Sequence, residues 1–241
     1  MTKELNFQKK NQYDRKFRKR VIEVTSKRFA LRKLIQPYQF AASVKFKSIL
    51  DRDFAYILEY DCNVNWYLEK PLIIVYEDIH GNKNLYCPSF IVEYFDGTAP
   101  KLIEVVKESM LSNMCLEQKN KYSAAEEFCK KNGLEFCLVT DVQIRIERRI
   151  ELSNYKFLVP YRDFYCNVNK EEKGFPVFNT DVALVRNKLV TKITIKELLI
   201  SITDDKKRQE ELLFQIWFMV ANRFISANLK EKLTVKSFIT K

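Results

Sequence analysis

The residues best suited to chemistry lie on a predicted β-hairpin and on the helix that precedes it. The stretch YCPSFIVEYFDGTAPKLIEVVKE, residues 86–108, predicts two apolar strands joined by an Asp96-Gly97 turn. Glu104 lies on the second strand, and Asp51 lies on the preceding predicted helix. Carboxylates brought together in a protein are good ligands for Mg²⁺. The hairpin is therefore the first candidate for a metal-dependent site.

Two positions of this hairpin lack the charge that such a site needs. Many Mg²⁺-dependent nucleases carry a similar hairpin, with an Asp after a Pro on the first strand and Glu-x-Lys on the second. Here Ser89 follows Pro88, and Val106 stands two residues after Glu104. A turn centred near Gly97 places Ser89 opposite Val106, with Glu104 diagonal to it. A neutral hydroxyl does not replace a carboxylate ligand, and the missing Lys removes a positive charge beside the attacking water.

Several readings of these residues remain open from the sequence. A one-residue bulge in the strand would turn Lys107 inward and restore a lysine. Asp51 and Glu104 alone would hold a metal ion only weakly. The simpler readings are an ion pair for Glu104, a boundary residue or local salt bridge for Asp51, and ordinary strand residues for Ser89 and Val106.

The elements around the hairpin predict an α/β domain. Residues 44–60 place Phe46, Leu50, Phe54, Ile57 and Leu58 at helical spacing. Residues 70–95 predict two strands around a His-Gly-Asn-Lys turn, and 101–108 a third strand. Residues 116–131 predict an amphipathic helix that stops at Asn132-Gly133, followed by a buried strand, LEFCLVT. The order helix, three strands, helix, strand predicts a mixed sheet flanked by helices.

The C-terminal part of the chain is predicted to be mainly helical. Pro160 and the polar stretch 167–176 suggest a boundary near 150–178. Helices are expected in TIKELLISI and in DDKKRQEELLFQIWFMVANRFI, and a short hairpin in the last residues. Two or three helices followed by a strand pair suggest a winged helix-turn-helix, which serves for binding DNA or protein. The predicted domains are an N-terminal arm, 1–40, an α/β domain, 41–160, and a C-terminal module, 178–241.

The N-terminal arm is strongly basic. Residues 1–36 hold twelve Lys or Arg against three Asp or Glu, whereas the whole chain has a net charge of +11. A polyanion such as DNA suits this arm, and Phe17, Phe29 and Tyr38 interleave with its charges. A solubilising tail and an acidic membrane surface are the alternatives. The expected DNA-binding residues are Lys9, Lys10, Arg15, Lys16, Arg18, Lys19, Arg20, Lys27, Arg28, Arg32 and Lys33.

Composition excludes several other classes of protein. No apolar run reaches the roughly 18 residues of a membrane span, and the charged start is not a secretory signal. The six cysteines form no C-x-x-C pair, which indicates free thiols in a reducing cytosol and argues against structural zinc. The only histidine, His80, lies in a polar turn. We therefore expect a cytoplasmic protein without histidine-dependent catalysis.

The ordered segments from SILDRDFAYILEYD through KLIEVVKE to KYSAAEEFCKKNGLEFCLVTDVQIR resemble the TnsA-like endonucleases. These are the 5′-strand-cutting subunits of heteromeric bacterial transposases, with a restriction-endonuclease-like (PD-(D/E)xK-type) fold. The resemblance covers residues 40–150, and 178–240 looks like the small module that often follows. It places the family's helix Glu at Asp51, its central metal-binding Asp at Ser89, and its Glu/Gln-x-Lys at Glu104-Val105-Val106. Only Glu104 is intact.

The resemblance implies a component of a transposition machinery. We expect it to bind DNA at transposon ends, a TnsB-like DDE transposase and a TnsC-like AAA+ regulator, near the bacterial nucleoid. The degenerate site implies no nuclease activity and no cofactor. The first alternative is an active endonuclease using Mg²⁺ or Mn²⁺ at Asp51 and Glu104 to cut 5′ strands. The second is a stand-alone DNA-binding or defence-associated protein.

Overall fold

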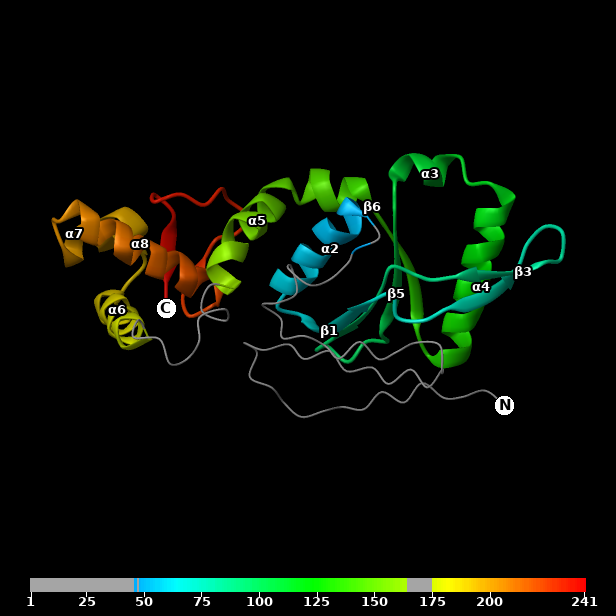
Figure 1. Cartoon of the computed structure of the whole chain (residues 1–241), viewed down its shortest axis with the longest axis horizontal. Coiled ribbons are helices and arrows are strands. Elements are labelled where there is room, and N and C mark those ends of the chain that lie inside the picture. Colours follow the sequence, from blue (N-terminus) through cyan, green and yellow to red (C-terminus); the bar gives the residue numbers. More distant parts are fainter. Residues whose placement is uncertain (1–45, 47, 164–174) are drawn as a thin grey trace. The chain divides into compact units, whose positions relative to one another are not determined.

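The computed structural model describes residues 46, 48–163 and 175–241. These residues form two compact units that divide between Arg148 and Arg149. The first is called here the α/β unit, and the second the C-terminal unit (Figure 1). The arm residues predicted to bind DNA lie outside the described part of the chain. The predicted domain limits, at 40, 160 and 178, remain a prediction.

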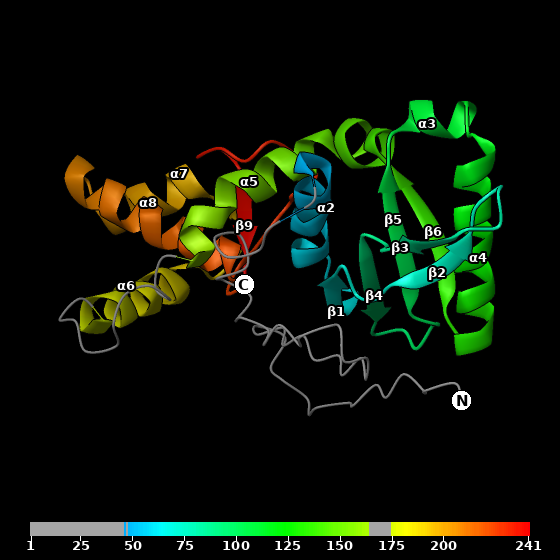
Figure 2. The same cartoon turned by 45° about the vertical axis from the view of Figure 1, so that its right-hand side comes forward.

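A four-stranded mixed sheet forms the centre of the α/β unit. Its order is β1-β4-β5-β6, from Val64–Glu69, Phe90–Tyr94, Lys101–Val106 and Glu135–Thr140. The pairs β1-β4 and β4-β5 are antiparallel, and β5-β6 is parallel. A parallel pair needs a crossover connection. Helix α4, Leu116–Asn132, lies within the connection from β5 to β6 and packs on the sheet (Figure 2).

The two faces of the sheet are covered by different elements. On one face, α2 (Ile49–Tyr60) packs its apolar side, and Phe54 meets Phe90 edge-on at 5.4 Å between ring centroids. On the other face lie α4 and a two-stranded hairpin, β2 (Ile74–Glu77) and β3 (Lys83–Tyr86). The buried core on that second face consists of Leu72, Ile74, Tyr76, Tyr86, Ile91, Leu102, Val106, Tyr122, Ala125, Cys129 and Leu134.

The structure bears out the mixed α/β architecture and several local signals, but it corrects the strand count. The Asp-Gly turn joins β4 to β5 as predicted, and α4 ends at Gly133, whose φ of +68° is left-handed. The span 70–95, expected to hold two strands, holds three: β2 and β3, which form a separate hairpin, and β4 of the main sheet. Strand β1 was missed because Asn63, Asn65 and a bulge between Val64 and Trp66 interrupt its alternation.

The predicted register of the β4-β5 hairpin is wrong by two residues. Phe90 pairs with Ile103 and Val92 with Lys101, so Ser89 falls opposite Glu104 rather than Val106. The observed pairs centre the turn between Asp96 and Gly97, where Asp96 accepts hydrogen bonds from both the backbone and the hydroxyl of Thr98. The predicted register came from a turn centre placed too late in the chain.

Three helical segments next to the predicted elements were not anticipated. Helix α3 spans Glu108–Ser112, a π-helix, η2, spans Val142–Glu147, and α5 spans Arg149–Asp163. Pro160 lies inside α5 rather than ending it. A proline in the last turn removes one hydrogen bond, and that loss is compatible with a helix that is about to end.

The C-terminal unit is a helical layer with a small sheet. It contains α5, α6 (Phe175–Lys188), α7 (Ile195–Ile202) and α8 (Lys206–Ala221). Three short strands, β7 (Ile193–Thr194), β8 (Ser226–Ala227) and β9 (Phe238–Thr240), form an antiparallel sheet in the order β7-β9-β8. Of these helices, α7 and α8 were predicted from the sequence, with α8 ending at Ala221, before the end of the predicted stretch. The short hairpin predicted within residues 228–241 is wrong, because β9 pairs with β7 and β8, which both lie before residue 228.

Helix α8 is the centre of this unit. It packs against α5, α6 and α7, and the rings of Phe157 and Trp217 meet edge-on at 5.1 Å between centroids. Thr194 caps α7 through a reciprocal pair of bonds with Glu197, and Asp205 caps α8. These caps fix where the two helices begin.

Candidate functional site

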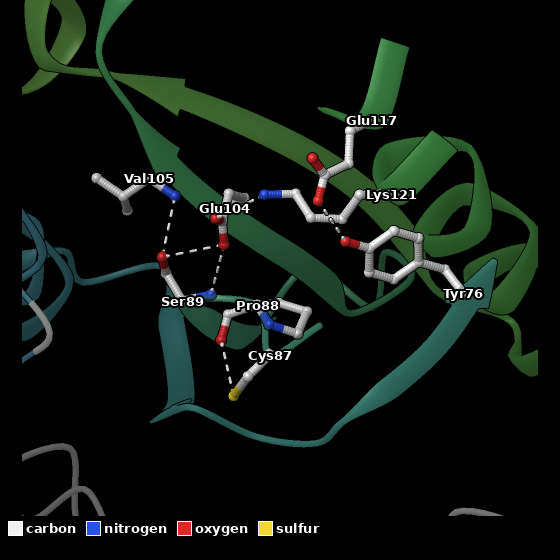
Figure 3. A network of polar contacts seen from close by, with 8 residues as sticks. All are labelled: Tyr76, Cys87, Pro88, Ser89, Glu104, Val105, Glu117 and Lys121. Carbon is white, nitrogen blue, oxygen red and sulfur yellow. Dashed lines mark hydrogen bonds and ion pairs between the residues drawn. The ribbon is translucent and has the colours of Figure 1, made fainter. Parts of the chain in front are cut away.

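Glu104 lies on β5 with its carboxylate buried at the end of the β4-β5 hairpin. Its side chain is 5% exposed. One carboxylate oxygen, Oε2, accepts hydrogen bonds from the backbone N–H of Ser89 at 3.1 Å and from the Ser89 hydroxyl at 3.3 Å. The other oxygen, Oε1, forms an ion pair with Lys121 at 3.9 Å (Figure 3). The surrounding side chains and backbone therefore hold the carboxylate from two sides.

Ser89 fixes the start of β4 by hydrogen bonds at each of its polar groups. In addition to its bonds to Glu104, its hydroxyl oxygen accepts a bond from the Val105 N–H at 3.1 Å. Its carbonyl accepts a bond from the Lys70 N–H at 2.8 Å. Figure 3 shows the hydroxyl between the Glu104 carboxylate and the Val105 amide. The serine thus bridges two strands, a role that a neutral hydroxyl fulfils because it both donates and accepts.

Lys121 of α4 is the residue that sequence reasoning missed. Its ammonium lies 4.8 Å from the ring centroid of Tyr86 and 4.7 Å from that of Tyr122, in addition to its pair with Glu104. Rings at this distance attract a cation through their electron-rich faces. The sequence did contain a signal for this position. Lys121, Ala125 and Cys129 are spaced four residues apart, so they lie on the same side of the helix, and Ala125 and Cys129 are buried. A lysine on an apolar stripe indicates a buried partner.

The two tyrosines beside Lys121 sit in a low-dielectric environment. Burial, followed by the nearby Glu104 carboxylate, raises the pKa of Tyr122 to about 12. The same two causes raise the pKa of Tyr86 well above its usual value. Both phenols are 6% exposed or less, so the ionised form would lose its hydration. Both hydroxyls therefore stay neutral at physiological pH, and the local charge comes from Glu104 and Lys121.

Asp51 lies near Ser89 but is tied to its own helix. It is 5% exposed, and its Oδ2 accepts a bond from the Ser48 hydroxyl at 2.8 Å. The Ser48 oxygen in turn accepts from the Asp51 N–H, which caps α2. Asp51 and Ser89 line one small pocket together with Phe46, Glu69, Lys70, Pro88 and Phe90.

The remaining predicted site residues are placed apart from this pocket. Val106 is 5% exposed and belongs to the core that contains Leu102 and Tyr122. The pairing of β5 with β6 is continuous, without a bulge, and Lys107 is exposed at the start of α3. The lysine that approaches Glu104 therefore comes from α4, across the core, rather than from β5.

The donor set does not fit a Mg²⁺ or Mn²⁺ ion. Such an ion prefers several carboxylate and water oxygens in near-octahedral geometry. Within the described residues, no group of three or more His, Cys, Asp or Glu is placed to hold a metal. At Glu104 the neighbours are a neutral hydroxyl and an ammonium, and a cation would be repelled by the ammonium.

The geometry defines an α/β unit with a mixed sheet flanked by helices, in which Ser89 contacts Glu104 and lines a small pocket with Asp51. Residues 61–141 match the family model described as TnsA-like endonuclease N terminal, which confirms the resemblance to TnsA-like transposon endonucleases for this region, about a third of the chain. No curated protein matches the sequence significantly. In the described part of the chain, no helix combines the length and the apolar character needed to cross a membrane.

Proposed function

We propose that the protein is a component of a DNA transposition machinery whose α/β unit has lost the ability to cut DNA. The match of residues 61–141 supports the transposition role. The observation that carries the loss of cutting is the arrangement at Glu104. A serine hydroxyl occupies the place of the family's metal-binding Asp, and the Lys121 ammonium faces the carboxylate.

The fold assignments that go with this proposal are a restriction-endonuclease-like α/β unit and a winged-helix-like C-terminal unit. The sheet with one parallel and two antiparallel pairs supports the first. The order β7, α7, α8, β8, β9, with β9 between the other two strands, supports the second. A protein of this kind acts as a scaffold that brings DNA and a transposase together.

The partners that we propose are transposon-end DNA, a TnsB-like DDE transposase and a TnsC-like AAA+ regulator. The basic arm, residues 1–40, would supply phosphate contacts, because its lysines and arginines outnumber its acids twelve to three over residues 1–36. Salt-sensitive binding to DNA and co-purification with a co-encoded transposase are the expected results. Failure of both would overturn this assignment.

The test of the inactive site is a substitution that restores a carboxylate. We expect the natural protein to leave transposon-end DNA uncut with Mg²⁺ or Mn²⁺, and to show no Mn²⁺ binding by calorimetry. Ser89→Asp places a second carboxylate beside Glu104, and the like charges then favour a divalent cation. This variant should bind Mn²⁺ at about 0.1–1 mM, the range of weak protein cation sites.

The matched control is Ser89→Asn, which has the shape of the Asp variant without its charge. It should bind no Mn²⁺, which separates a charge effect from a change of shape. Metal-dependent cutting by the natural protein, abolished by Asp51→Ala or Glu104→Ala, would contradict the proposal. That result would establish an active Mg²⁺-dependent endonuclease in its place.

A further inference from the structure

The loop between β8 and β9, residues 228–237, carries exposed lysines on a backbone that hydrogen bonds hold in place. We call it the wing segment. Its Lys230, Lys232 and Lys236 are exposed. The segment also touches the start of α7, since the N–H of Lys196 donates to the carbonyl of Val235 at 2.8 Å. Lys192 lies over the Phe238 ring at 5.0 Å. Lysines from three places along the chain thus gather around one loop.

The backbone of the wing segment is fixed by two small turns. In the first, the Asn228 side chain accepts from the Lys230 N–H at 3.1 Å and donates to Glu231 at 2.7 Å. In the second, the Thr234 hydroxyl accepts from the Lys236 N–H at 3.1 Å, and Ser237 Oγ accepts from the Thr234 N–H at 2.9 Å. Each turn places a lysine two residues after its capping residue. A preformed loop loses little conformational freedom when it binds.

Asn154 anchors the middle of the segment to α5. Its amide nitrogen donates to the carbonyls of Leu229 and Glu231 at 2.9 and 2.7 Å. Its amide oxygen accepts from the Leu233 N–H at 3.0 Å. Asn154 is 3% exposed and Leu233 is 8% exposed, so the anchor is inside the unit while the lysines remain outside.

The acidic residues on this surface are already engaged in local hydrogen bonds. Glu231 accepts from Asn228, and Glu197 caps the start of α7 through Thr194. These neutral donors leave both carboxylates charged, but the exposed lysines of this surface outnumber these two acids, so the net charge presented to a ligand is positive: Lys192, Lys196, Lys230, Lys232 and Lys236. Several lysines held on one loop can each contact a phosphate of a polyanion such as a nucleic acid.

Helix α8, the alternative surface, is poorly suited to a nucleic acid. Its Arg208 pairs with both Asp181 and Glu211. The exposed residues at its start include Asp204, Asp205, Glu210 and Glu211 beside Lys206 and Lys207. A helix in a groove of DNA would bring these carboxylates close to phosphates.

From these observations we propose that the C-terminal unit binds the phosphate backbone of double-stranded DNA through the lysines of the wing segment together with Lys192 and Lys196, and not through α8. This contact is additional to the N-terminal arm of the proposed function. Contacts made by lysines to phosphates carry no base information. The binding should therefore be independent of DNA sequence and strongly dependent on salt.

The test uses full-length protein and fluorescence anisotropy on a labelled duplex of arbitrary sequence, titrated at several KCl concentrations. The wing variant carries K230Q, K232Q and K236Q. The control variant removes the same charge elsewhere, with K130Q, K206Q and K207Q, all exposed lysines. The wing variant should lose about 10- to 100-fold in affinity near 0.1 M salt, with a salt slope lower by about 2–3. The control should change less than about two-fold.

A further variant separates this inference from the proposed role of the arm. It replaces Lys9, Lys10, Arg15, Lys16, Arg18 and Lys19 by Gln. Loss of affinity in this variant alone would overturn the wing contact and leave the arm as the DNA site. Loss in the wing variant alone would overturn the arm and support the wing. Equal losses in the wing and control variants, or loss of transposase binding without loss of DNA binding, would overturn the wing contact with DNA.

Discussion

Two buried polar centres of this molecule, Glu104 in the α/β unit and Asn154 in the C-terminal unit, are satisfied in different ways. Asn154 is neutral, and its three hydrogen bonds, at 2.7–3.0 Å, all go to backbone groups of the wing segment. Glu104 carries a carboxylate, and its contacts with Ser89 and Lys121 are longer, at 3.1–3.9 Å. Two of them come from the side chains of Ser89 and Lys121.

The difference shows which centre is held by backbone groups and which depends on other side chains. A substitution elsewhere in the wing segment does not remove a backbone carbonyl or N–H, so the partners of Asn154 remain as long as the loop keeps its conformation. Side-chain partners can be exchanged one at a time while the backbone stays in place. At Glu104 a hydroxyl and an ammonium are two of the groups that contact the carboxylate, and both come from side chains.

The largest effect is expected at Asn154. Asn154→Ala leaves two carbonyls and one N–H without this partner inside the unit, and should lower the free energy of unfolding by about 2–4 kcal/mol. The two tryptophans, Trp66 and Trp217, lie in different units. In a Trp66→Phe background, the fluorescence of Trp217 therefore follows urea unfolding of the C-terminal unit.

The control for this substitution is Asn228→Ala. Its side chain also bonds within the wing segment, but it is exposed. Its loss should cost below about 1 kcal/mol, because water replaces the lost bonds. Equal losses for the two variants would show that burial of the Asn154 bonds is not what stabilises the unit.

A smaller effect is expected at Lys121. Lys121→Met keeps the apolar stem but removes the charge that faces Glu104, and should lower the free energy of unfolding of the α/β unit by about 1–2 kcal/mol. The value is below that of a close buried pair because the nitrogen–oxygen distance is 3.9 Å and the lysine side chain is 23% exposed. Trp66 fluorescence in a Trp217→Phe background reports this unit.

A double-mutant cycle separates pairing from packing at this site. Glu104→Gln in the Lys121→Met background should recover part of the loss, because the buried carboxylate no longer lacks its cation. A double variant as unstable as the sum of the single variants would mean that the two side chains do not interact, and the ion pair would have no energetic role.

The smallest effect, absent at neutral pH, is expected from the tyrosines beside Glu104. The pKa of Tyr122 is raised to about 12, above the value of about 10 in an unfolded chain. The unfolded state therefore releases its proton first, and the stability of the α/β unit should fall as pH rises from about 10 to 12. Urea unfolding measured between pH 8 and 11 should show this decline.

Tyr122→Phe should make the decline shallower, since it removes one of the titrating groups. Tyr56→Phe is a matched control, because the same change is made at a partly exposed tyrosine of α2. An unchanged pH dependence in the Tyr122 variant would show that its phenol does not contribute to the alkaline loss of stability.

Local signals predicted much of the fold and less of the site. The Asp-Gly turn and the Asn-Gly helix stop were readable because each depends on a few neighbouring residues. Strand β1 and the register of β4-β5 were not, because both depend on pairing between segments. Lys121 was missed because its partner Glu104 is distant in sequence.

The sequence by itself determined which charges are present at the hairpin: a carboxylate at Glu104, and neutral side chains at Ser89 and Val106. It also determined the family resemblance of the α/β unit. Only the tertiary structure decided which groups meet. It set Ser89 against Glu104 and brought Lys121 across the core from α4. The physical reason is that a charge within a few ångströms acts through space, whatever the separation of the residues along the chain.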